Sequence, residues 1–201
     1  MKYLSVWSGG GYQFLQSYDY YEPRTAGMYY LLPKLLFGNL TISTDYRKTL
    51  AIDMMTSGYL GNRDGIKGFH LIINQIIRVN DHMQLNSSSE FHKYINNQGF
   101  ATRSGGQVIF GQRQLQTIVN SLNGKYLFNE NISLTLAVRH YYSKGKYESF
   151  FNLLDNGTLQ TNPEYTGNHD FNYNIFNIDM AFSWIFSPGS LLSLVWKNEI
   201  S

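Results

Sequence analysis

Histidines are the first residues to consider for metal binding and acid–base chemistry. The five occur far apart in the chain, at His70, His82, His92, His140 and His169. Two ligands on one strand face are two residues apart, and two on one helical face are three or four apart. No pair of these histidines has either spacing. We therefore predict that they lie on a surface or in a lumen and hold no metal.

Carboxylates and cysteines complete the search for chemistry. The 14 Asp and Glu are scattered over 201 residues, so no general acid–base pair can be named. The absence of cysteine excludes disulfides and thiolate metal sites. We predict no catalytic residue, no metal, no cofactor and no enzymatic activity. An enzyme with its site in outer loops, a third hypothesis, would need a carboxylate cluster or a Ser–His pair, and neither is found.

Two motifs look like ligand loops but are better explained as turns. Asp155-Asn156-Gly157-Thr158 begins like a calcium loop but lacks the remaining acidic ligands, so we predict a hairpin turn. Gly9-Gly10-Gly11 and Gly105-Gly106 are not followed by the Lys-Ser/Thr of a phosphate loop. Glycine within a strand more often relieves crowding at a bend.

The composition favours a wall with one face to lipid and one to water. Charged residues make up 15% of the chain, against roughly 25% in a soluble domain. There are 16 Tyr, 13 Phe and 18 Gly. This mixture of apolar and uncharged polar residues is typical of outer-membrane barrels. The net charge is +2 with no basic run, so we predict no nucleic-acid partner.

A two-residue periodicity is the dominant signal and indicates strands. The clearest apolar row alternates with mostly small or polar residues, and we predict that it faces lipid: Phe176, Ile178, Met180, Phe182, Trp184 and Phe186. Similar rows occur at 132–138 and 50–54. No run of about 18 apolar residues exists, so no transmembrane helix is expected.

Connections of two lengths alternate along the chain. Short ones are predicted at 80–82, 129–131, 187–189 and 38–39, and long ones at 17–26, 59–65, 95–107 and 143–171. Outer-membrane barrels combine short turns on one rim with long loops on the other. We predict strands at 3–16, 27–37, 40–58, 66–79, 83–95, 107–128, 132–143, 172–186 and 190–200. Segment 107–128 is long enough for a hairpin arm, and 143–171 for an extra short hairpin.

The predicted architecture is an all-β, antiparallel, up-and-down transmembrane β-barrel. Residues 1–201 would form a single barrel segment of about nine membrane strands. Bacterial barrels normally have an even number, so we expect an incomplete part of a larger barrel. The N-terminus lacks the apolar core of a signal peptide. We therefore expect that N- and C-terminal parts of the parent protein are missing.

Two blocks carry a family resemblance. They are residues 107–154 and 171–201, and the most specific run is FNID…W.FSPGS.L.LVWKN in the second block. Both resemble the C-terminal barrel of a Gram-negative outer-membrane family of unknown function. Longer members of that family carry an N-terminal domain similar to carbohydrate-binding family nine. The resemblance implies an exported barrel and an association with glycans, and it supplies no functional residues.

Charged and aromatic residues offer the remaining site candidates. The best lumen-facing candidates are Asp53, Arg78, Arg139 and Asp179, which would form either a solvated interior network or a selectivity filter. Aromatic residues gather near strand ends and outer loops: Tyr18, Tyr20, Tyr21, Tyr141, Tyr142, Tyr147, Phe150 and Phe151. They would form either an interfacial girdle or a platform for sugars.

The first hypothesis is a barrel segment in the Gram-negative outer membrane, in contact with membrane lipid. Its role would be anchoring or transport, with glycan binding through outer loops or a missing domain. The alternative is a soluble periplasmic or surface β-sandwich that binds a ligand. The barrel leaves Ile178, Met180, Phe182, Leu134 and Leu136 exposed to lipid, whereas the sandwich covers them with a second sheet.

Overall fold

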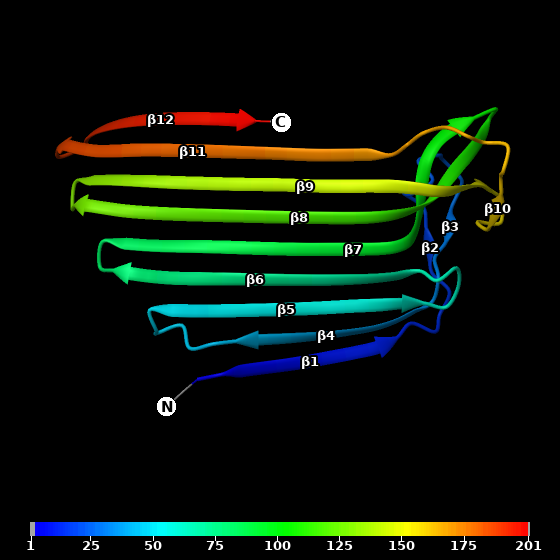
Figure 1. The fold of residues 1–201 in the computed structure, drawn as a ribbon, viewed down its shortest axis with the longest axis horizontal. Helices are drawn as coiled ribbons and strands as arrows, with labels where there is room; N and C mark the ends of the chain where they lie inside the picture. Colours follow the sequence, from blue (N-terminus) through cyan, green and yellow to red (C-terminus); the bar gives the residue numbers. More distant parts are fainter. Residues whose placement is uncertain (1–2, 201) are drawn as a thin grey trace.

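The computed structural model describes residues 3–200, and strands are its only regular elements. Nine of them form one row in which every neighbouring pair is antiparallel (Figure 1). In spatial order they are β1 (Ser5–Tyr12), β4 (Leu35–Ser43), β5 (Leu50–Gly61), β6 (Lys67–Asn80), β7 (Met83–Ser104), β8 (Gln107–Asn129), β9 (Ile132–Leu153), β11 (Phe171–Ser187) and β12 (Ser190–Ile200). The prediction of an all-β antiparallel fold is confirmed.

The sheet is open. β1 pairs only with β4 and β12 only with β11, and these two strands lie at opposite edges in Figure 1. Apart from the β2–β3 excursion and β10, strands adjacent in sequence are adjacent in space, which is the up-and-down order expected from the alternating turns. Closure of the sheet into a barrel is not part of this structure and stays a prediction.

Asparagine side chains explain two of the tight turns on the short-turn rim. Asn80 Oδ1 accepts a hydrogen bond from the His82 N–H at 2.9 Å. Asn129 Oδ1 accepts from the Asn131 and Ile132 N–H groups at 2.8 and 2.9 Å. Such short side chains hydrogen-bond to the backbone two or three residues on and hold the turn without further contacts. The short turns predicted at 80–82, 129–131 and 187–189 are therefore correct.

The predicted turn at 38–39 was wrong. Gly38 and Asn39 lie in the middle of β4, where Gly38 pairs with Gly10 of β1 and with Gly58 of β5. The strand predicted at 27–37 is also wrong, because residues 13–34 leave the sheet. β4 and β5 are instead joined by residues 44–49, so the strand predicted at 40–58 is divided in two.

The long loop predicted at 95–107 was wrong as well, and the one predicted at 143–171 was wrong over residues 143–153, which continue β9. β7 continues to Ser104 and turns through Gly105 and Gly106, whose φ angles of 58° and 81° favour glycine. β7 and β8 thus form the expected hairpin arm. The extra hairpin is present too: β10 (Leu159–Thr161) pairs with the end of β9 across the Asp155-Asn156-Gly157 turn.

Residues 13–34, which we call the cap, cross the rim that carries the longer connections. They contain the two-residue strands β2 (Tyr18–Asp19) and β3 (Tyr30–Leu31). The main buried cluster of the molecule lies here, where Tyr30 packs on Val108, Phe110 and Leu153. Register shifts occur in β7 and between β8 and β9, close to the residues that contact the cap. Such bulges bend strands. The hydrophobic core therefore holds the cap to the strand ends.

Candidate functional surfaces

The sheet has one apolar and one polar face, because successive side chains of a strand point to opposite sides. We call the face that carries Ile178, Met180 and Phe182 the apolar face. Directly paired residues share a face, so the register extends it over the sheet. One row of partners on it is Leu50, Ile77, Leu85, Gly124, Leu136, Met180 and Trp196.

The predicted lipid-facing row lies on this face. Phe176, Ile178, Met180, Phe182 and Trp184 pair in order with His140, Val138, Leu136, Leu134 and Ile132 of β9. Phe186 lies at a register shift beside the last turn and is 57% exposed. No second sheet of residues 3–200 lies over the row, and Met180 and Leu136 are 39% and 37% exposed. Contact with lipid stays a prediction.

A short polar stripe interrupts the apolar face. Ser89, Asn120 and His140 are consecutive partners on β7, β8 and β9. The Asn120 amide lies 3.5 Å from a His140 ring nitrogen, and the other ring nitrogen lies 2.8 Å from Asn174 Oδ1. These pairs satisfy part of the hydrogen-bonding capacity of the stripe, so the face is not uniformly apolar.

The opposite, polar face carries all four predicted lumen residues. Asp53 and Arg139 belong to one row that crosses all nine strands: Ser5, Ser43, Asp53, Asn74, Ser88, Ser121, Arg139, Asn177 and Glu199. Asp179 lies opposite Lys197, and Arg78 lies opposite Gln84. The four lie on four different strands, so the structure assigns them one face but does not gather them into one cluster.

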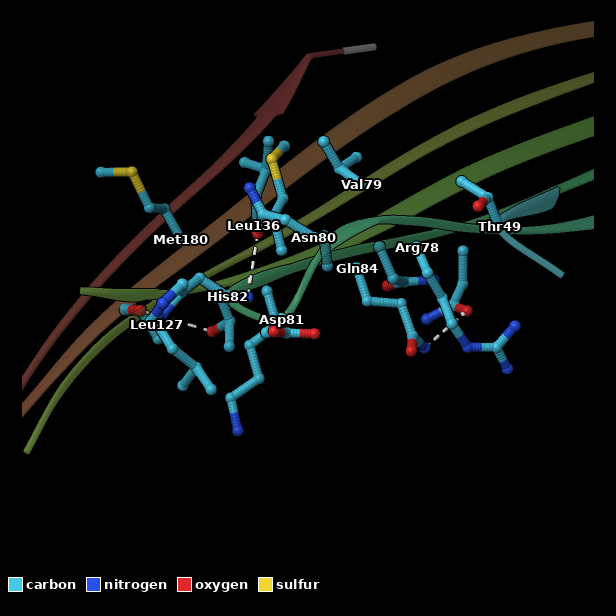
Figure 2. A pocket seen from close by; sticks show the side chains of 18 of the residues that line it. Thr49, Arg78, Val79, Asn80, Asp81, His82, Gln84, Leu127, Leu136 and Met180 are labelled. Carbon is cyan, nitrogen blue, oxygen red and sulfur yellow. Dashed lines mark hydrogen bonds between the residues drawn. The ribbon is translucent and has the colours of Figure 1, made fainter. Parts of the chain in front are cut away.

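A basic hollow of about 930 Å³ lies at the short-turn rim (Figure 2). Its charged lining comprises Arg47, Lys48, Arg78, Lys125, Asp81 and Asp179. Arg78 Nη1 donates to the carbonyls of Tyr46 and Lys48 at 2.7 and 3.1 Å and thereby fixes the β4–β5 loop. Arg78 and Asp179 were predicted from the sequence, but the other four were missed. Arg47 and Lys48 lie on the β4–β5 loop, Asp81 in the β6–β7 turn and Lys125 on β8, and only the fold brings them together.

The β4–β5 loop is further held by an ion pair. Arg47 donates through Nε and Nη2 to the two carboxylate oxygens of Asp45 at 2.9 and 2.8 Å. This fork of two parallel bonds is the strong form of an Arg–carboxylate contact. The hydrogen bonds from Arg47 hold the pKa of Asp45 well below its usual range. Asp45 therefore stays ionised in the folded loop.

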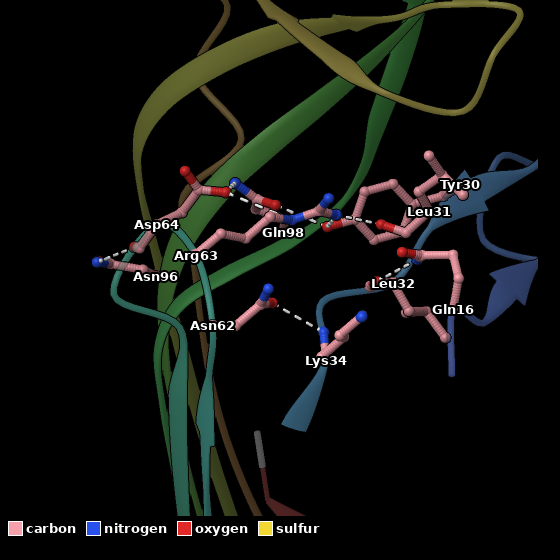
Figure 3. A network of polar contacts seen from close by, with 10 residues as sticks. All are labelled: Gln16, Tyr30, Leu31, Leu32, Lys34, Asn62, Arg63, Asp64, Asn96 and Gln98. Atoms are coloured by element: carbon pink, nitrogen blue, oxygen red, sulfur yellow. Dashed lines mark hydrogen bonds and ion pairs between the residues drawn. The ribbon is translucent and has the colours of Figure 1, made fainter. Parts of the chain in front are cut away.

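A polar network fixes the cap to the sheet (Figure 3). The Tyr30 hydroxyl donates to Gln98 Oε1 at 2.6 Å, and Gln98 Nε2 donates to Asp64 Oδ2 at 3.1 Å. Arg63 donates to the Leu31 carbonyl. Burial raises the pKa of Tyr30, so its hydroxyl remains a neutral donor. The network joins the cap to the β5–β6 loop and to β7.

The sheet register brings two histidines together that are far apart in the chain. His70 and His92 are direct partners, with ring centroids 4.7 Å apart. His92 Nε2 lies 3.4 Å from Glu90. Their separation in sequence gives no sign of this contact. Even so, no group of three His, Asp or Glu side chains within residues 3–200 is arranged to hold a metal ion.

The predicted aromatic residues divide between the cap and β9. Tyr141 and Tyr142, predicted near a strand end, lie instead in the middle of β9, because this strand continues to Leu153. Tyr18 and Tyr20 contact Tyr29, with centroids 5.4 and 5.7 Å apart, and Tyr21 is 90% exposed. Tyr147 stacks on Phe150 at 5.8 Å near the end of β9. The cap tyrosines thus lie outside the sheet, away from any girdle along its strands.

The chain was compared with known proteins. A family model described as a domain of unknown function (DUF5916) matches residues 1–201. No curated protein and no solved structure matches the chain. Within the described part of the chain, no helix is long and apolar enough to cross a membrane.

Proposed function

The chain belongs to the DUF5916 family of domains of unknown function, and we propose that its sheet is part of the wall of a Gram-negative outer-membrane β-barrel. The apolar face would contact lipid, and the polar face would line the interior. The wall would serve anchoring or transport. No covalent chemistry is proposed, since the described residues contain no arrangement of side chains that would perform it.

The observation that carries the proposal is the height of the apolar face. On β9 it runs from Ile132 to Tyr142, interrupted by His140, and ends at Lys144, although the strand itself continues to Leu153. This length agrees with the roughly 9–11 residues that a tilted strand needs to cross a bilayer. Strands in such barrels alternate between an apolar outside and a polar inside, and the strands of this sheet alternate between an apolar and a polar face.

The alternative of a soluble β-sandwich is less well supported. A sandwich requires a second sheet over Ile178, Met180, Phe182, Leu134 and Leu136. Within residues 3–200 the only other sheet is the β2–β3 pair, which belongs to the cap at the rim. An uncovered apolar face nine strands wide, on the order of 40 Å at ~4.8 Å per strand spacing, would cause aggregation in water.

The open edges constrain how such a barrel would close. β1 and β12 run in the same direction, because neighbouring strands alternate in direction and an odd number of strands lies between these two. Direct pairing of the two would be parallel, whereas bacterial barrels are antiparallel with an even strand number. We propose that an odd number of further strands, from elsewhere in the full-length protein, completes the wall. Lipid cannot satisfy open strand edges, so closure is required.

Glycan binding by the cap is a second candidate, and the exposed tyrosines favour it. Tyr20 and Tyr21 are 62% and 90% exposed, and Asp19 Oδ1 holds their turn by accepting the Tyr21 N–H at 2.8 Å. Aromatic rings presented in this way can stack on sugar rings. Replacement of both tyrosines by Ala should remove binding to immobilised cell-surface polysaccharide. Unchanged binding would eliminate this role for the cap.

Gel migration of the full-length protein tests the main proposal. The outer-membrane fraction is loaded boiled and unboiled, with a known periplasmic protein as the fractionation control. A closed barrel resists detergent, so we expect the unboiled band to migrate differently and to occur in the membrane fraction. A soluble periplasmic protein with no shift on boiling would refute the barrel and restore the sandwich.

A further inference from the structure

A row of glycines leaves a hollow in the apolar face next to the cap rim. Gly10, Gly38 and Gly58 are consecutive partners on β1, β4 and β5. Beside Gly38 and Gly58 the surface contains a hollow of about 480 Å³ with apolar walls, which include Leu36, Leu60 and Phe69. We call it the glycine hollow. Its floor lacks side chains because the neighbouring strands β4 and β5 both have glycine at this level, Gly38 and Gly58.

Two lysines lie at one side of the glycine hollow. Lys67 on β6 and Lys93 on β7 line it and share the apolar face, since Lys67 pairs with Ile95 and Lys93 with Phe69. No acidic residue lies on this face of β5, β6 or β7. The ion pairs found within residues 3–200 lie elsewhere and use Arg47, Arg63, His92 and Arg113 as cations. The two ammonium groups therefore have no carboxylate partner among the residues that the structure describes.

We propose that the glycine hollow binds an anionic phospholipid, with an acyl chain on the glycine floor and the phosphate beside Lys67 and Lys93. The inference rests on the proposed function, since it requires the apolar face to contact lipid. Lysines at the end of an apolar strand row extend along it and place their charge at headgroup level. Basic pockets at this level recognise lipid phosphates. A protein partner would need matching carboxylates, whereas a phospholipid supplies charge and chain together.

The floor of the hollow can be filled without disturbing the backbone. A Cβ built on Gly38 meets only the Gly9 carbonyl oxygen, at 3.8 Å, which is ordinary contact. By contrast, a Cβ on Gly10 would lie 2.7 Å from the Phe37 carbonyl oxygen. Gly38→Leu is therefore the suitable variant to occupy the acyl-chain position, while Lys67→Gln with Lys93→Gln removes the charge.

Native mass spectrometry of the full-length protein, released from mixed phosphatidylglycerol and phosphatidylcholine micelles, tests the proposal. Wild type should retain phosphatidylglycerol preferentially. The double lysine variant should retain it about thirtyfold less, because each lysine near an anionic lipid contributes roughly a fivefold preference. Gly38→Leu should lose retention of both lipids. The matched charge control, Lys34→Gln with Lys197→Gln, should behave as wild type, since Lys34 lies in the cap and Lys197 on the polar face.

Each contrary result has a distinct meaning. Retention that is unchanged in the double lysine variant, or equally reduced in the control, would refute the phosphate site. If the double lysine variant loses lipid retention and Gly38→Leu does not, the acyl chain does not occupy the hollow. Displacement of the bound lipid by inorganic phosphate would lead to the same conclusion. In each of these four cases the protein would still shift on boiling. A wild-type protein that is soluble and shows no shift would overturn this inference together with the barrel.

Discussion

The face assignment can be tested by placing one charge at the middle of the apolar row of β11. Met180 is the central residue from Phe176 to Trp184 and is flanked by Leu136 of β9 and Trp196 of β12. It is 39% exposed, with no carboxylate on either partner strand at its level. Met180→Arg would therefore place an unpaired guanidinium in the bilayer core.

Ala181→Arg is the matched control, since it adds the same side chain one residue away on the polar face. Its partners are Thr135 of β9 and Val195 of β12. The two substitutions lie ~3.4 Å apart along the strand and so have nearly equal depth. Only their face differs.

The expected penalty follows from the cost of arginine at the membrane midplane. It amounts to about 2–4 kcal/mol on the lipid face, whereas an interior arginine remains solvated. A factor of ten in the folding equilibrium corresponds to about 1.4 kcal/mol, so Met180→Arg should shift the equilibrium by roughly 30- to 700-fold. Urea unfolding of the full-length protein in vesicles, followed by tryptophan fluorescence, measures this difference. Equal losses in the two variants, or a larger loss in Ala181→Arg, would refute the assignment of faces.

Three further predictions concern the cap, the β4–β5 loop and the polar stripe. Tyr30→Phe removes the hydrogen bond to Gln98, which contributes about 0.5–1.5 kcal/mol. Hydrogen exchange of the cap amides should therefore accelerate about two- to tenfold. An unchanged exchange rate would contradict the role of the polar network in holding the cap to the sheet. Because burial raises the folded-state pKa of Tyr30, its contribution should persist at neutral pH and disappear as the pH rises above about 10. Asp45 has a lowered folded-state pKa, so the protease resistance of loop 44–49 should be full above pH ~4 and should fall as the pH decreases through that lowered pKa. Asp45→Asn should abolish this pH dependence. If the variant keeps the dependence, the ion pair with Arg47 is not its cause. Asn120→Leu should stabilise the protein in vesicles by about 1–3 kcal/mol in urea unfolding. An amide that faces hydrocarbon is costly, and the contact of Asn120 with His140 is too long to offset that cost. Destabilisation would instead show that the polar stripe does not face lipid.

The regular parts of the sheet could be predicted from the sequence because each strand carries its own signal. The row from Phe176 to Trp184 alternates without interruption, and the turns beside it contain Asn or Pro-Gly. Local periodicity therefore assigns residues of one strand to two faces. The register places Asp53, Arg78, Arg139 and Asp179 on the face opposite this row, while the lumen that they were predicted to face stays a prediction.

The errors occur where partners distant in sequence decide the structure. Gly38-Asn39 has the composition of a turn, yet Gly38 lies within a strand because β4 pairs with β1 on one side, through Gly10, and with β5 on the other, through Gly58. The polar segment from Asn96 to Ser104 reads as a loop, but it pairs with β8 and its arm is covered by the cap. Such pairings override local propensity, which is weak for short polar strands.

Strand length separates the membrane wall from half of a sandwich more sharply than the apolar rows do, since both architectures have one apolar face. β7, β8 and β9 have 22, 23 and 22 residues. At about 3.3 Å per residue each is on the order of 70 Å long, whereas strands of globular domains usually have about 3–10 residues. A sandwich of such strands would need an apolar face along their whole length. On β9 that face ends at Lys144, and beyond it the strand packs against the cap. The proposed bilayer would account for this limit, because it would cover only the part of each strand that crosses it.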